Sequence, residues 1–100
     1  MQNMPNPFNP VTTIRYQVPK VDGLSRVTVR LAVYNILGEQ VRQLLAENVL
    51  PGYHSILWDG KNMYGKEVAT GLYIYQIQAT FKNEKKKVNF IKARKMMVIK

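Results

Sequence analysis

The sequence predicts an all-β fold, an antiparallel sandwich of about seven strands. Short segments in which apolar and polar residues alternate recur along the chain, as in strands with one buried face. Glycine and proline turns separate these segments. The chain has 100 residues and no cysteine, and 46% of its residues are hydrophobic. This is enough to bury one core without a disulfide or a metal, so we expect a single domain over residues 1–100.

The stretch from Leu57 to Ile77 gives the strongest β signal. It contains the only tryptophan and three of the six glycines. Asp59-Gly60 ends one aromatic strand, and Gly71 begins the next. Trp58 is the largest apolar side chain, so we expect the core to pack around it. Asp59, Gly60 and Gly71 are expected to shape the connection.

The N-terminal third predicts an extended segment and two strands. Residues 1–10 are rich in proline and are therefore expected to be extended or turned. Phe8, the lone aromatic residue there, is expected to plug one end of the core. Thr12 to Val18 alternates as a half-buried strand and stops before Pro19. Val27 to Tyr34 alternates in the same way.

The rest of the chain predicts further strands. Gln40 to Leu45 is interpreted as a strand, although propensity alone also allows a helix over Glu39 to Asn48. Tyr53 to Trp58 is the fourth strand and Gly71 to Phe81 the longest. Val88 to Lys100 closes the chain as one long or two short strands. This many short strands in a chain of this length indicate a sandwich of immunoglobulin type.

The charge is strongly positive and uneven. The formal net charge is +9, and Glu84 is the only acid from Lys82 onward. A positive field favours anionic partners, whereas lysines can also simply keep a strand edge from pairing with other chains. No nucleic acid is expected, because exposed aromatic residues are not interleaved there. Whether residues 82–93 are an ordered hairpin or a mobile loop stays open. The basic patch comprises Lys82, Lys85, Lys86, Lys87, Lys92 and Arg94.

No catalytic or metal-binding pattern is found, so we expect no enzyme activity, no cofactor and no metal. His54 is the only histidine, and Ser55 beside it would point to the opposite face of a strand. Asp59, Asn62 and Glu67 do not have the spacing of a calcium loop. Asp59 is better interpreted as a turn residue that bonds its own loop backbone.

Four blocks of sequence follow one another in order along the chain. They are Gln2–Tyr16, Val33–Val41, Gly52–His54 with Trp58–Gly60 and Gly71–Tyr75, and Arg94–Lys100. Together they resemble the C-terminal sorting domains of type IX secretion systems, and each block is weak alone whereas the set is specific to this family. The resemblance implies an immunoglobulin-like sandwich at the C-terminus of a larger exported protein. It also implies that Met1 was added when the domain was cut from a longer chain.

In that family the domain is an address for export. The resemblance implies recognition by the outer-membrane translocon, then removal by a sortase-like peptidase that attaches the cargo to an anionic lipopolysaccharide. The protein would be secreted or held at the cell surface, after passage through the periplasm and outer membrane. The expected recognition element is the terminal strand, whose edge is also open to dimerisation. It comprises Lys95, Met96, Met97, Val98, Ile99 and Lys100.

Two other functions stay open. Trp58 to Ile77 also resembles the immunoglobulin-like domain of flagellar hook-capping proteins, which implies a structural assembly module. Alternatively, an accessory adhesion domain would use the basic end to bind acidic polysaccharide. A sorting domain must end its protein, and the sequence stops at Lys100 just after the motif, which favours the sorting hypothesis. Met4, where an aromatic is usual, and the insertion Lys82 to Lys87 depart from the sorting pattern.

Overall fold

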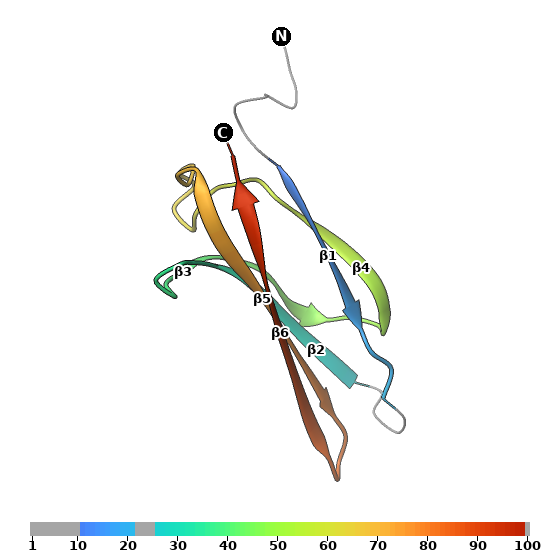
Figure 1. The fold of residues 1–100 in the computed structure, drawn as a ribbon. Helices are drawn as coiled ribbons and strands as arrows, with labels where there is room; N and C mark the ends of the chain where they lie inside the picture. The colour runs from blue at the N-terminus through green and yellow to red at the C-terminus, as the bar shows by residue number, and fades with distance from the viewer. Residues whose placement is uncertain (1–10, 22–25, 100) are drawn as a thin grey trace.

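The computed structural model describes residues 11–21 and 26–99, which form two antiparallel sheets (Figure 1). One sheet has the strand order β1-β4 and the other β3-β2-β5-β6. The predicted all-β sandwich is confirmed, with six strands in the described residues because the last segment is one long strand. Phe8 and Lys100 lie outside the described residues. The strands are β1 (Thr12–Val18), β2 (Arg26–Asn35), β3 (Gln40–Asn48), β4 (Gly52–Trp58), β5 (Gly71–Lys82) and β6 (Lys87–Val98).

The core lies between the two sheets and follows the alternation of the strands. Val29, Leu31 and Val33 of β2 are fully buried. They pair in register with Ala79, Ile77 and Tyr75 of β5. Each large apolar side chain buried in this way contributes about 1.5–3 kcal/mol. The buried apolar residues are Ile14, Val18, Val27, Val29, Leu31, Ala32, Val33, Trp58, Val68, Tyr73, Ile77, Ala79, Phe81 and Val98.

The segment with the ambiguous pattern is a strand, so the helical alternative is wrong. β3 pairs with β2 from Gln40 to Asn48, three residues beyond the predicted end at Leu45. The turn before it is held by Asn35, whose Oδ1 accepts the amide hydrogens of Leu37 and Glu39 at 3.0 Å each. Once this hairpin closes, the ladder with β2 satisfies the backbone groups that a helix would otherwise bond.

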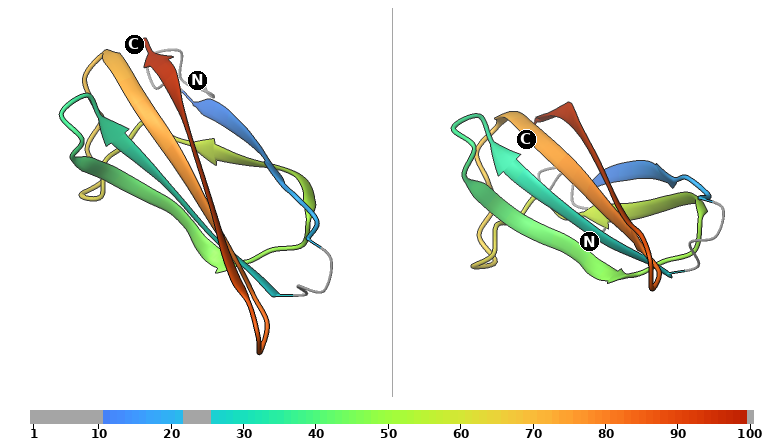
Figure 2. Two further views of the ribbon diagram at one scale, coloured as in Figure 1. Left: turned by 60° about the horizontal axis from the view of Figure 1, so that its bottom comes forward. Right: turned by 90° about the horizontal axis from the view of Figure 1, so that it is seen from below.

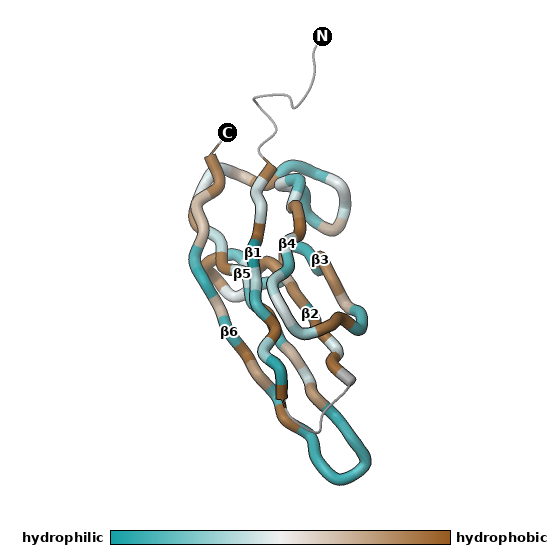
Figure 3. Tube along the Cα trace, turned by 90° about the vertical axis from the view of Figure 1, so that its right-hand side faces the viewer, coloured by the Kyte–Doolittle hydropathy of each residue, from teal (hydrophilic) through white to brown (hydrophobic). Residues whose placement is uncertain are grey.

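The sandwich is elongated, with the β5–β6 hairpin at one end. The molecule extends over 52 × 31 × 21 Å, and the β5–β6 hairpin projects from one end (Figure 1). The tip of that hairpin is hydrophilic, and the start of β1 and the end of β6 lie at the opposite end (Figure 3). No helix in the described residues is long and apolar enough to cross a membrane.

Candidate functional site

Trp58 anchors the connection between β4 and β5. Its ring is fully buried and meets the Tyr73 ring edge-on, with centroids 5.8 Å apart and planes at 69°. The Trp58 Nε1–H donates to the carbonyl oxygen of Lys61 at 3.0 Å. The Tyr73 hydroxyl donates to the carbonyl of Ala69 at 2.7 Å. Two core aromatic residues thus hold both ends of the β4–β5 loop, residues 59–70.

The loop's carboxylate and amide oxygens are used by its own backbone. Asp59 Oδ1 accepts the Lys61 amide hydrogen at 3.0 Å and the Arg42 guanidinium at 3.1 Å. This ion pair is partly exposed, so it contributes at most about 1 kcal/mol. Asn62 Oδ1 accepts two amide hydrogens in the same loop. Within the described residues, no group of three or more metal-ligating side chains occurs.

The two predicted loop glycines differ in conformation. Gly60 has φ 75°, in the left-handed region, and its carbonyl accepts the Val68 amide hydrogen at 2.9 Å. Gly71 lies outside that region, and a Cβ there would meet nothing within 4 Å. The backbone therefore demands glycine at position 60 and not at position 71.

His54 packs against an aromatic ring rather than a nucleophile. It stacks on Tyr16 with ring centroids 5.3 Å apart and planes at 23°. Its Nε2 lies 2.6 Å from the carbonyl oxygen of Leu50. Burial, and to a lesser degree the carboxylate of Glu47, raises the pKa of the Tyr16 hydroxyl. Ser55 follows His54 on β4 and projects to the other face, so this strand brings no hydroxyl to the ring.

The terminal strand lies at a sheet edge. Among the strands that the structure describes, β5 is the only neighbour of β6 in the sheet. Met97 and Ile99 are 58% and 69% exposed, and Lys95 is also exposed. Val98 is 1% exposed and belongs to the same core cluster as Trp58. The predicted recognition segment therefore has one face in solvent and the other in the core, with Met96 half-buried on the core side.

The predicted basic patch is two separate features. Lys82, Lys85, Lys86 and Lys87 lie at the tip of the β5–β6 hairpin and are exposed. Lys92 and Arg94 lie in the middle of β6, opposite the core-side residues Ile77 and Tyr75 of β5. Directly opposite residues project to the same face of a sheet. Lys92 and Arg94 therefore point toward the inside of the sandwich, not outward with the hairpin.

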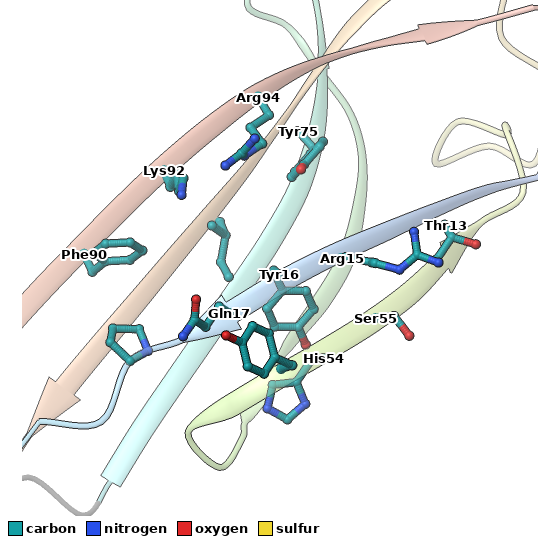
Figure 4. A pocket seen from close by; sticks show the side chains of 13 residues that line it. Thr13, Arg15, Tyr16, Gln17, His54, Ser55, Tyr75, Phe90, Lys92 and Arg94 are labelled. Atoms are coloured by element: carbon teal, nitrogen blue, oxygen red, sulfur yellow. The ribbon is translucent and has the colours of Figure 1, made fainter.

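A groove of about 920 Å³ opens between β1 and β6 on this side of the sandwich (Figure 4). Sequence reasoning missed this groove. Its signal was the alternation of β6, which places Lys92 and Arg94 in phase with the apolar Phe90 and the buried Val98. Its lining residues are Thr13, Arg15, Tyr16, Gln17, Pro19, Tyr53, His54, Ser55, Tyr75, Ile77, Phe90, Lys92 and Arg94.

Four exposed apolar side chains lie on the β2–β3 turn and the β4–β5 loop. These two segments lie at the same end of the molecule (Figure 2). The Met63 amide hydrogen donates to the carbonyl of Val41 at 3.0 Å, which holds the loop against the start of β3. We call the four side chains here the apolar end. They are Ile36, Leu37, Met63 and Tyr64, which are 68%, 80%, 53% and 79% exposed.

These observations define an immunoglobulin-like β-sandwich that offers surfaces for binding. A family model described as the FlgD Ig-like domain matches residues 21–83. The chain therefore belongs to the FlgD Ig-like domain family. This agrees with the predicted resemblance to hook-capping proteins, whereas the resemblance to type IX sorting domains stays a prediction.

The fold is shared with solved structures, among them the crystal structure of FlgD from P. aeruginosa, with a TM-score of 0.59 and 21% sequence identity. The match covers 84% of this chain and 58% of that chain, so this domain corresponds to little more than half of that protein's length. The search of curated proteins found no match.

Proposed function

We propose that this domain is a non-catalytic structural module that holds protein subunits together outside the cytoplasm, as hook-capping proteins do. Membership of the FlgD Ig-like domain family supports this proposal. The observation that carries it is the apolar end, where Leu37 and Tyr64 are 80% and 79% exposed. Clusters of exposed apolar side chains mark protein–protein contact sites, because burying them in a complex removes them from water.

The contact surface can be tested by photocrosslinking in the host. The full-length protein carries a photoreactive residue at position 37, 64 or 50. Leu50 is a matched control, because it is also an exposed leucine, at 77%, but lies outside the apolar end. We expect crosslinks to the host's hook subunit from positions 37 and 64 and not from 50. Equal crosslinking from all three positions, or none to that subunit, would refute the proposal.

A second candidate is the sorting domain, favoured by the free edge of β6 and the exposed Met97 and Ile99. Extended segments can add as strands to such an edge. Under this proposal, the partners are the type IX translocon, the sortase-like peptidase and anionic lipopolysaccharide. The domain would direct its attached cargo to the cell surface.

The sorting candidate is tested by substitution rather than by truncation, because deleting residues 96–100 would also remove the buried Val98. We would fuse residues 1–100 to a signal-peptide-bearing fluorescent reporter in a bacterium with a type IX system. The expected result is surface reporter, with periplasmic reporter in a translocon-deficient strain. Replacing Met97 and Ile99 with glutamate should hold the reporter in the periplasm. Ile91→Glu, earlier on β6, should leave the reporter at the cell surface. Periplasmic reporter in both strains would refute this candidate.

A further inference from the structure

Two free strand edges frame the groove. Within residues 11–21 and 26–99, β1 pairs only with β4 and β6 only with β5, so no described strand lies between the facing edges of β1 and β6. The smaller sheet leaves the middle of β6 uncovered, since residues 91–95 are all exposed. Ile77, the β5 residue opposite Lys92, is only 3% exposed. The sandwich therefore has an open place beside β1, above the inner face of β6.

The chemistry of this open place is apolar with positive charge. Tyr75 and Ile77 of β5 and Phe90 of β6 supply apolar surface. Lys92 and Arg94 point into the groove from β6 (Figure 4). No aspartate or glutamate belongs to the lining, and neither cation forms an ion pair within the described residues. Cations on the core side of a strand with no acid beside them form a site complementary to carboxylates.

We propose that the groove binds an extended acidic segment of another protein, which adds as a strand to the free edge of β1. Its backbone would bond the unpaired amide and carbonyl groups of β1, as in other strand additions. Its inward side chains would alternate between apolar contact with Phe90 and Tyr75 and carboxylates paired with Lys92 and Arg94. This goes beyond the proposed function, because it does not use the apolar end and adds the strand to β1 rather than to β6.

The probe is a fluorescent peptide of about ten residues, long enough to span one strand, in which every second residue is alternately glutamate and valine and the residues between them are threonine. One face of the bound strand then presents both carboxylates and apolar side chains. The matched control is the same peptide with lysine in place of each glutamate. Fluorescence anisotropy with the 100-residue chain should show binding of the acidic peptide and none of the basic one. Binding of neither peptide would overturn the proposal, and the inward cations would then serve only to keep the strand edges from pairing.

Two double variants separate the groove from general electrostatic attraction. Lys92→Glu with Arg94→Glu should weaken binding of the acidic peptide by at least about tenfold. Lys85→Glu with Lys86→Glu makes the same change in net charge at the hairpin tip and should weaken it by less than about threefold. Equal weakening by the two pairs would overturn the proposal.

Peptide N-methylation tests strand addition itself. The amide groups of an edge strand point alternately toward and away from its new neighbour. One peptide methylated on alternate residues should therefore bind, and the peptide methylated on the other set should not. Amide signals of Thr13, Arg15 and Gln17 should shift on binding. Binding of both methylated peptides would overturn the proposal. So would a free chain that already forms a dimer and that Arg94→Glu converts to a monomer. Leu37→Glu with Tyr64→Glu should leave peptide binding unchanged, which keeps this test separate from the proposed function.

Discussion

At the scale of single residues, Trp58 joins the core to the β4–β5 loop through one hydrogen bond and one aromatic contact. Trp58→Phe keeps most of the ring but removes the donor to the Lys61 carbonyl, and we expect a loss of about 1–2 kcal/mol of unfolding free energy. Trp58→Ala also opens a cavity and should cost about 3–5 kcal/mol. Urea unfolding measures both values. Leu37→Ala, at an exposed position, should stay within about 0.5 kcal/mol of the parent, and an equal loss there would contradict this account.

Tyr16 should make stability sensitive to alkaline pH. Its pKa is raised by burial and by Glu47, so the folded chain keeps the phenol neutral after the unfolded chain has ionised at its ordinary pKa near 10.0. The unfolded state then binds fewer protons, and stability falls as the pH rises through the folded-state pKa. Tyr16→Phe should reduce this fall in denaturation measured from neutral pH to about pH 11. Parallel curves for the two proteins would contradict the prediction.

At the scale of elements, the tip of the β5–β6 hairpin is a charged turn that the core does not need. Residues 83–86 are exposed, and Asn83 Oδ1 accepts the amide hydrogens of Lys85 and Lys86 at 2.9 and 2.7 Å. Replacing residues 83–86 by Asn-Gly should change the unfolding free energy by less than about 1 kcal/mol, because that turn suits a two-residue hairpin. The shortened chain should elute from a sulfated polysaccharide column at lower salt. Unchanged elution would argue against the adhesion alternative.

The strands could be predicted from alternation, but their partners could not. β1 and β2 have regular apolar positions, whereas the last residues of β3, Ala46 to Asn48, carry no β signal of their own. They are strand because β2 lies beside them, with Thr28 Oγ1 donating to Asn48 Oδ1 at 3.0 Å. The pairing of β1 with β4 joins segments far apart in the chain, and no local pattern specifies it.

The groove was missed for a related reason. Sequence proximity grouped Lys92 and Arg94 with the lysines of the hairpin tip. Their side chains point inward because a strand reverses its face at every residue, and the register with Ile77 and Tyr75 fixes which face that is. Knowing that this face is uncovered requires the position of the second sheet.

At the scale of the whole molecule, repulsion between positive charges should lower stability. The net charge is +9, and Arg42–Asp59 is the one ion pair among the described residues. Raising sodium chloride from roughly 0.01 M to roughly 1 M shortens the Debye length from about 30 Å to about 3 Å. We therefore expect the melting temperature to rise by a few degrees, as measured by circular dichroism. A melting temperature that falls with salt would mean that attractive pairs dominate instead.

The strand order also determines when this chain can fold during synthesis. The central strand β2 has β3 as one neighbour and β5 as the other, and its first residue, Arg26, pairs with Lys82. β1 likewise waits for β4, because Thr12 pairs with Trp58. A nascent chain that ends before β5 can pair β2 with β3 and β1 with β4, but Val29 and Leu31 still lack Ala79 and Ile77, their neighbours on β5. The larger sheet must therefore assemble late. Until then, the apolar side chains of β2 are exposed and its free edge can pair with any other strand.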